Sequence, residues 1–372
     1  MKKTRVRLTN QEALYLGLEP KEKEGYSKDR NPRYMLEDEQ FFKLKKYREE
    51  GKKDIPLSIK GTSTLYDKNG NIIVEWVKTD KDKQDTLNAL KVAVETLKED
   101  IEPVPPSLEP SHDYNVNLLN QYTLTDYHLG MMSWGEETGS DWNTKIAEDT
   151  LVKFFQTAIE QSPIAENAIF ANIGDFLHWD GLDAVTPANK HVLDADTRFT
   201  KLVRVAIKVI RRIISMLLDK YQMVTVIMAE GNHDPASSVW LKELLNAFYE
   251  NEPRIRINTS ADPYYCVVFG DNCLFYHHQH KRRITNIDSV FVSKFKKEFG
   301  ESSFVYAHLG HLHHDKVIET NLMRLEQHRT LASKDSYASR GGYASDRDSK
   351  VITYHKNYGE VGRNTINIKM IS

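Results

Sequence analysis

Apolar positions in the first hundred residues follow helical and strand spacings in turn. Leu36–Glu50 has apolar residues at helical intervals with lysines around the other face, and Thr86–Leu97 repeats helical spacing. Between these segments, residues 63–79 predict a β-hairpin that turns at Asn69-Gly70. We therefore predict a small basic α+β accessory domain over residues 1–100. Its basic helix either contacts nucleic acid or presents a solvated charged face.

A proline-dense stretch follows this segment. Residues 102–106 read Glu-Pro-Val-Pro-Pro, and Pro110 comes soon after. Proline lacks the backbone N–H that a sheet needs and disfavours helix at the residue before it. The sequence therefore predicts an extended linker over residues 101–113. The second domain is expected to occupy residues 114–372.

Beyond the linker, short apolar runs alternate with longer amphipathic segments. The short runs predict buried strands and the longer segments predict helices. This alternation predicts a layered α/β architecture. The expected strands are 116–125, 168–173, 224–228 and 273–276, and the expected helices are 143–161, 197–220, 237–249 and 286–299.

Composition narrows the class of protein only slightly. Lys and Arg total 51 against 53 for Asp and Glu, so the net charge neither indicates nor excludes a polyanionic partner. No stretch approaches the ~18 apolar residues of a membrane span, so we expect a cytoplasmic protein with no membrane contact. Cys266 and Cys273 flank a predicted turn, and two free thiols are expected rather than a disulfide.

Polar clusters follow nearly every expected strand of the second domain. Ligands in open α/β sheets gather at the carboxyl ends of strands, so we expect these clusters to converge. Alternate residues of an extended segment point the same way, so each Asp/His or His/His pair could face one side or straddle two neighbouring metals. The clusters are Asp126-Tyr127-His128, Gly174-Asp175, Gly231-Asn232-His233-Asp234, His277-His278-Gln279-His280 and Gly310-His311-Leu312-His313.

The donor types in these clusters indicate the kind of metal. They combine carboxylates, imidazoles and an amide oxygen with no thiolate, which fits Mn, Fe or Zn at two adjacent sites better than a structural zinc held by cysteines. A single histidine is usually a structural or surface residue. Five ordered clusters favour metal binding instead.

The five motifs in order resemble the signature of the calcineurin-like metallophosphoesterases and span residues 126–313. The resemblance implies a four-layer α/β/β/α sandwich, in which two packed mixed sheets are flanked by helices. It also implies a phosphoesterase with two divalent metal ions, with Mn expected and Fe or Zn as alternatives. One metal would be held by Asp126, His128 and His313, the second by Asn232, His278 and His311, and Asp175 would bridge them.

The same resemblance implies catalytic roles. His233 would act as a general acid beside the scissile phosphate, and Asp234 would brace its loop. His178, three residues after the bridging Asp175, is similar to a histidine that DNA repair exonucleases of this superfamily carry, hydrogen-bonded to the acid histidine. Residues 341–343 resemble the tail of homologues encoded by phages, which would place the protein in the host cytoplasm. These nucleases often form homodimers.

Two segments near the motifs leave alternatives open. His278 is favoured as the ligand over His277, and His280 is expected to contact substrate. A run of three cations follows: Lys281, Arg282 and Arg283. They either line the entrance for a phosphate chain or form a solvated charged run.

Two long segments are predicted to be irregular. Residues 179–198 read as a loop that covers substrate. In the tail 336–363, Arg340 and Tyr343, together with Arg347 and Arg363, could clamp phosphate and stack on a base, or belong to a rigid turn with surface arginines.

The sequence therefore predicts a metal-dependent phosphodiesterase that cleaves DNA with water activated between two metals. A phosphomonoesterase or a phosphodiesterase for small nucleotides would need the same metal ligands, so it remains an alternative. A further alternative is a non-catalytic interaction module that recruits a partner through the first hundred residues.

Overall fold

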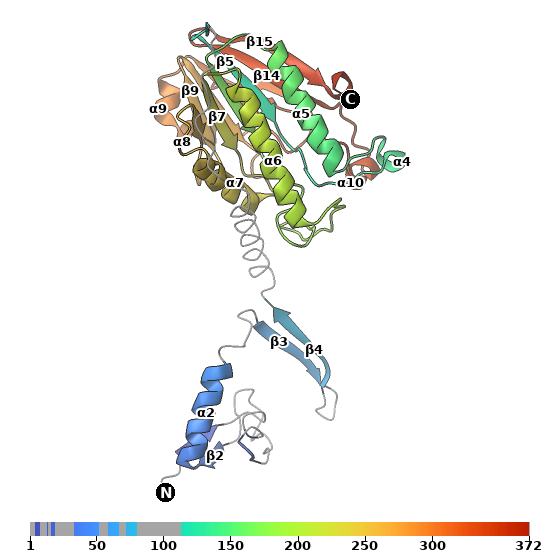
Figure 1. Cartoon of the computed structure of the whole chain (residues 1–372), viewed down its shortest axis with the longest axis vertical. Helices are drawn as coiled ribbons and strands as arrows, with labels where there is room; N and C mark the ends of the chain where they lie inside the picture. Colours follow the sequence, from blue (N-terminus) through green and yellow to red (C-terminus); the bar gives the residue numbers. More distant parts are fainter. Residues whose placement is uncertain are drawn as a thin grey trace. The chain divides into compact units, whose positions relative to one another are not determined.

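The computed structural model describes residues 4–7, 13, 16–18, 33–51, 59–66, 72–79 and 113–371. The chain divides into two compact units, Met1–Gln84 and Asp85–Ser372, each considered by itself (Figure 1). The turn expected at Asn69-Gly70, the helix expected at 86–97 and the linker residues 101–112 lie outside the described residues. They remain predictions.

The first unit contains both kinds of element that its sequence predicts. Strands β1 (Thr4–Arg7) and β2 (Arg33–Leu36) pair antiparallel, and helix α2 (Asp38–Gly51) follows. Strands β3 (Ile59–Tyr66) and β4 (Ile72–Thr79) form the expected antiparallel pair. A small apolar cluster among the described residues of this unit comprises Ala13, Tyr34, Leu36 and Leu44.

The second unit is built on two mixed sheets. The first has six strands in the order β15-β14-β5-β6-β7-β8, and its four strands from β5 to β8 are parallel. Strands β6 and β7 are mostly apolar, which suits strands that are covered on both faces. The strands are β5 (Leu118–Leu124), β6 (Asn167–Asn172), β7 (Met223–Met228), β8 (Ile255–Ile257), β14 (Asp348–His355) and β15 (Gly359–Asn367).

The second sheet has five strands in the order β12-β13-β11-β10-β9. Strand β11 is parallel to both of its neighbours, whereas the two edge strands run antiparallel. The strands are β9 (Tyr265–Phe269), β10 (Asn272–His277), β11 (Phe304–Leu309), β12 (Lys316–Glu319) and β13 (Arg324–Gln327).

The two sheets pack face to face and helices cover both outer faces. Ile169 and Ile227 of the first sheet meet Leu274 and Tyr276 of the second in one buried cluster. Helices α5 (Thr144–Gln161), α6 (Phe199–Leu218) and α7 (Pro235–Phe248) cover the six-stranded sheet, and α8 (Asp288–Lys294) and α9 (Lys296–Gly300) cover the five-stranded one (Figure 1). This is the four-layer α/β/β/α arrangement, so the predicted fold class is confirmed.

Two sequence predictions for this unit are wrong. The helix expected over 286–299 is divided at Phe295, whose φ and ψ of −121° and 50° leave the helical region. The tail 336–363 is not a long irregular segment, because it contains helix α10, strand β14 and the start of strand β15. The shorter elements are α4 (Gly135–Thr138), α10 (Ser336–Arg340) and the 3₁₀ turn η1 (Ile368–Met370).

Among the described residues, no helix combines the length and the apolar character that crossing a bilayer requires.

Candidate metal centre

All five polar clusters begin where a strand ends. Asp126 lies two residues beyond β5, Asp175 three beyond β6, and His278 directly after β10. The loop that carries Asn232 follows β7, and the one that carries His311 follows β11. Strands of both sheets therefore deliver these side chains to one place.

The expected ligands form two overlapping groups. Asp126, His128 and His313 offer ligand atoms within 4.8 Å of one another, and Asp126 also belongs with Asp175, His278 and His311 to a second such group. The amide oxygen of Asn232 lies 3.2 Å from Nε2 of His278. Asp126 is common to both groups, whereas the resemblance gives the bridging role to Asp175.

The surroundings of His278 fit a cation. Its Nδ1 lies 2.9 Å from the carbonyl oxygen of Ile173, which can only accept, so the neutral ring carries its proton there. Its Nε2 lone pair would then face Oδ2 of Asp175 at 2.9 Å, Oδ1 of Asn232 at 3.2 Å and Oδ1 of Asp126 at 3.7 Å. A lone pair among three oxygen atoms is repelled unless a positive charge lies between them.

Two further observations agree with a cation at this place. Oδ1 of Asp126 is buried and accepts no hydrogen bond, although Nε2 of His313 lies 3.1 Å away. Burial opposes protonation of His278, but the carboxylates of Asp175 and Asp126 raise its pKa to about 10. With no metal bound, the buried imidazole thus supplies the positive charge that the carboxylates require.

The backbone at the expected ligands is left-handed. Asp126, His128, Asp175, His311 and His313 have φ between 48° and 76°, and they are five of the seven non-glycine residues in the described part with positive φ. The extended geometry expected for the Asp/His and His/His pairs is therefore wrong. The members of the last pair contribute to different groups, so they straddle the centre. Such strain gathers at functional sites.

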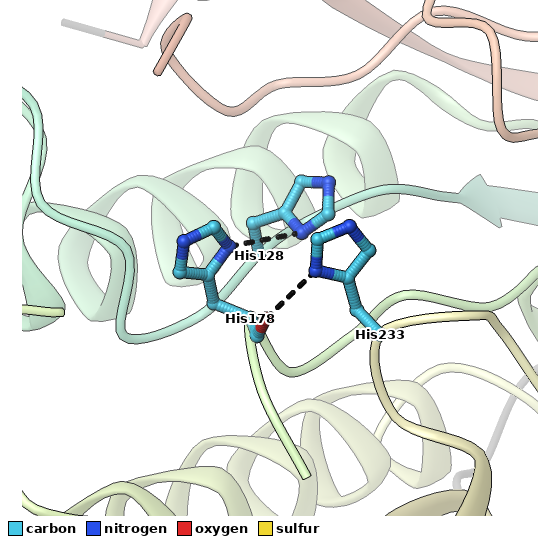
Figure 2. Close-up of side chains that lie close together, drawn as sticks. All are labelled: His128, His178 and His233. Atoms are coloured by element: carbon cyan, nitrogen blue, oxygen red, sulfur yellow. Dashed lines mark hydrogen bonds between the residues drawn. The ribbon is translucent and has the colours of Figure 1, made fainter. Parts of the chain in front are cut away.

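Two histidines, His178 and His233, lie beside His128 of the first group (Figure 2). Nδ1 of His233 lies 2.8 Å from the backbone carbonyl oxygen of His178, and the two rings stack with centroids 5.5 Å apart. Nδ1 of His178 instead lies 3.4 Å from Nδ1 of His128. The ring-to-ring hydrogen bond that the resemblance implies between His178 and His233 is thus replaced by a contact to the backbone.

Asp234 holds the His233 loop from inside. Its buried carboxylate accepts the N–H of Asp175 at 3.2 Å and that of Leu177 at 3.0 Å, which ties the third motif to the second. Asp234 occupies the N-cap position of α7 but makes no cap hydrogen bond with its side chain.

Asp180 takes over that capping role, which the sequence analysis did not anticipate. Its carboxylate accepts the N–H groups of Ala236 and Ser237 at 2.6 and 2.7 Å, in the first turn of α7. Because Asp180 is far from α7 in the sequence, no sequence pattern near the start of the helix reveals this cap. Thr125 is also absent from the predicted site, although its hydroxyl donates to Oδ2 of Asp126 at 2.6 Å.

The fourth cluster offers three histidines, and the structure separates them. His278 faces the carboxylates, while His277 stacks on Tyr264 with centroids 4.3 Å apart. The ring of His280 lies 5.5 Å from that of His278, next to the centre. Lys281 is 3.5 Å from Oε1 of Glu230, and Arg282 and Arg283 are exposed.

The arginines of the tail have other partners than the expected phosphate. Arg340 pairs with Glu137 of α4 at 3.0 Å, and Arg363 forks onto Glu326 at 2.8 and 2.9 Å. Arg347 donates to a backbone carbonyl oxygen and lies over the ring of Trp142. Tyr343 is 54% exposed.

Away from the expected ligands, His308, Glu326 and His328 also have the spacing of metal ligands. The carboxylate of Glu326 already binds Lys350 at 2.7 Å and Arg363 at 2.8 Å. A cation would be repelled by both. We therefore interpret this cluster as a buried ion network.

The sequence matches no known family model and no curated protein. Among solved structures it is similar to a novel archaeal phosphodiesterase, with 13% identity and a TM-score of 0.33 over 67% of this chain and 99% of that one. A predicted phosphoesterase from Streptococcus pneumoniae gives 10% identity and a TM-score of 0.26 over 68% and 99%. A 5′-nucleotidase precursor from Thermus thermophilus gives 11% and 0.32 over 67% and 54%. Similarities this low assign neither a family nor an activity to this chain.

Proposed function

We propose that this chain is a two-metal phosphodiesterase of the calcineurin-like kind and that it cleaves DNA. One observation carries the proposal. Two overlapping groups of ligand atoms share Asp126, and the ring of His233 lies 4.7 Å from that of His128 at their edge. The arrangement combines a place for two cations with an adjacent proton donor.

Two divalent cations, Mn in our proposal with Fe or Zn as alternatives, would lower the pKa of a water molecule and offset charge on phosphoryl oxygens. The protein supplies a partly buried set of oxygen and nitrogen donors with no thiolate, which suits these metals. The proposed ligands are Asp126, His128 and His313 for one cation and Asn232, His278 and His311 for the other, with Asp175 shared.

His233 is the proposed general acid. Its Nδ1–H donates to the carbonyl oxygen of His178, so only the imidazolium form has a second proton, at Nε2, to give to a leaving oxygen. Burial, followed by the effect of His233, lowers the pKa of His178 to about 3. His178 is then neutral near pH 7 and does not repel the imidazolium.

DNA as the substrate is supported by groups around the centre. His280 lies beside His278, and the exposed cations of Lys281 and Arg282 follow it directly, where they can contact phosphates. Arg340 and Tyr343 are further proposed contacts.

A substrate panel with Mn tests this function. Linear DNA, a cyclic nucleotide and an aryl phosphomonoester are incubated separately with the full chain. We expect cleavage of DNA. Hydrolysis of the monoester alone would reject the nuclease and favour the phosphomonoesterase.

Replacement of the acid tests the mechanism. His233→Asn should lower the rate on DNA by about 10²–10⁴-fold while two metals remain bound, because proton donation contributes about this much. His355→Asn is the matched control, since His355 pairs with Leu118 at the opposite end of the sheet. An undiminished rate in His233→Asn would contradict the role of this residue.

A further inference from the structure

Three segments that begin beside the candidate metal centre contact one another on the surface. The first continues from His128 to α4, and the second continues from His178. The third begins beside Thr330, whose hydroxyl donates to the carbonyl oxygen of Asp126 at 2.7 Å. We call these segments, residues 129–143, 179–198 and 329–346, the rim.

Hydrogen bonds between distant residues join the rim into one body. Ser133 donates through its hydroxyl to the carbonyl oxygen of Lys334 at 2.6 Å, and the N–H of Met132 donates to the carbonyl oxygen of Asp194 at 2.9 Å. Ser336 donates to the carboxylate of Asp194 at 2.8 Å. The rim is thus fixed to the centre and internally connected.

Large aromatic side chains of the rim are turned to solvent. Trp134 is 60% exposed, Tyr337 77% and Tyr343 54%. Tryptophan and tyrosine usually bury most of their rings. Several exposed rings next to a catalytic centre indicate a surface that binds something.

An ion pair joins the two short helices that carry or adjoin two of these rings. Trp134 is the extended residue directly before α4, which carries Glu137, and Tyr337 lies three residues before Arg340 on α10. Arg340 and Glu137 are 3.0 Å apart, and α4 and α10 lie side by side (Figure 1). The exposed rings of Trp134 and Tyr337 are therefore carried by two elements that this ion pair joins.

The third ring lies over the turn that follows α10. A Cβ at Gly341 would come within 2.5 Å of the ring of Tyr343, so the ring covers this glycine. The N–H of Tyr343 also donates to the carbonyl oxygen of Ala338 at 3.0 Å. Tyr343 is thus held on the same body.

The charges of this surface indicate which part of a nucleic acid fits it. Arg340 is paired, and the carboxylates of Asp141 and Asp335 accept the N–H groups of Gly135 and Ala338 at 2.6 and 2.7 Å. The surface offers flat rings rather than free cations, so it suits bases and not a phosphate backbone. Only a single strand exposes the faces of its bases.

We propose that α4 and α10 form a base-stacking platform that holds the single-stranded part of a polynucleotide during cleavage at the metal centre. This inference rests on the proposed phosphodiesterase function. Trp134 follows His128 by six residues, so their Cα atoms are at most about 20 Å apart, a distance that several nucleotides span.

The test compares a substrate with bases to one without. The double variant Trp134→Ala/Tyr337→Ala is assayed with Mn on a single-stranded oligothymidylate and on bis(p-nitrophenyl) phosphate. Stacking contributes ~1–3 kcal/mol per base, so kcat/KM for the oligonucleotide should fall about 10–100-fold, mainly through KM. The rate on the small diester should stay within about twofold. Trp134→Phe/Tyr337→Phe keeps the rings and should restore the oligonucleotide rate.

Three results would overturn the platform. They are an unchanged oligonucleotide rate, an equal loss on both substrates, and no restoration by phenylalanine. An unchanged rate combined with a lower molecular mass in sedimentation would identify the rings as a contact between two copies of the chain. A different result would reject the proposed function. In that case the wild-type protein itself would hydrolyse neither the oligothymidylate nor bis(p-nitrophenyl) phosphate.

Discussion

Two glycines beside the expected ligands, Gly231 and Gly310, leave no space for a side chain. A Cβ at Gly231 would lie 2.0 Å from Oδ1 of Asp175 and 2.3 Å from its backbone N. A Cβ at Gly310 would lie 2.1 Å from Oγ1 of Thr125. The motif glycines are therefore required because the loops approach one another closely.

Gly231→Ala should inactivate the protein. The new methyl group collides with backbone as well as side chain, so Asp175 must move, and a displacement of about 1 Å can lower a rate about 100-fold. We expect a loss of this size on DNA with reduced metal content. Gly181→Ala is the control because nothing lies within 4 Å of its Cβ position. Equal rates in the two variants would show that the loop adapts.

The carboxylates should decide metal occupancy. Asp126→Asn and Asp175→Asn each remove a negative charge from a buried group of ligands. We predict fewer than two metal ions per chain in each variant, measured by elemental analysis after dialysis. Asp219→Asn, at the exposed end of α6, should keep both. Two ions in either test variant would refute the assignment.

At the scale of single residues, the sequence predicted which side chains lie together but not their geometry. Motif order placed the expected ligands, because each follows a strand that a short apolar run reveals. It could not show that Asp126 belongs to both groups or that His233 contacts the carbonyl oxygen of His178, since both depend on left-handed backbone and on loops from different strands.

Among the elements, α7 links the acid loop to the rest of the centre. It starts directly after Asp234, whose carboxylate faces the amides of Asp175 and Leu177. Its first turn is capped by Asp180 instead. The position of His233 therefore depends on a residue from the preceding loop.

Asp180→Ala should destabilise α7 and displace His233. Loss of a helix cap costs about 0.5–2 kcal/mol of unfolding free energy, which urea denaturation measures. We also expect a lower rate on DNA. Asp219→Ala at the other helix should change neither quantity. Loss of stability with an unchanged rate would mean that the cap does not position the acid.

Helices and central strands were predictable, whereas the strands of the tail were not. An apolar run marks β6 and β7, and an amphipathic repeat marks α6. Strand β14 carries Asp348, Lys350 and Thr353 into buried positions. Lys350 is satisfied by Glu326 of the other sheet, a partner that no local pattern reveals.

Across the whole second unit, the ion network around Glu326 joins the two sheets. Glu326 belongs to β13, while Lys350 and Arg363 come from β14 and β15. His308 bonds the ring of His328 at 2.9 Å and the hydroxyl of Tyr354 at 2.9 Å. These contacts fix how one sheet lies on the other, and thereby where their loops meet.

This network predicts sensitivity to acid. Burial lowers the pKa of His328 from 6.5 to about 4, although Glu326 opposes the shift. Between these values the unfolded chain binds a proton that the folded chain does not, so stability falls as pH falls from 6.5 to 4. The full effect is about 3 kcal/mol.

His328→Gln should therefore flatten the stability profile in this window. Urea denaturation of metal-free protein at several pH values between 4 and 7.5 measures it, and titration of the other histidines cancels in the comparison with wild type. Gln156→Ala, at an exposed position of α5 without a titratable side chain, should leave the slope as it is. If stability changes with pH in His328→Gln as it does in the wild type, then His328 binds protons equally in the folded and unfolded states. The prediction would then be wrong.

No residue of the rim is an expected metal ligand, and the rim is joined to the centre through Thr330 and backbone hydrogen bonds. The rings that would hold a substrate are thus carried by other residues than those that would hold the metals. A chimera that takes residues 134–138 and 336–343 from another protein of this kind and keeps Asp180 and Thr330 is consequently a direct way to test whether this surface selects the substrate.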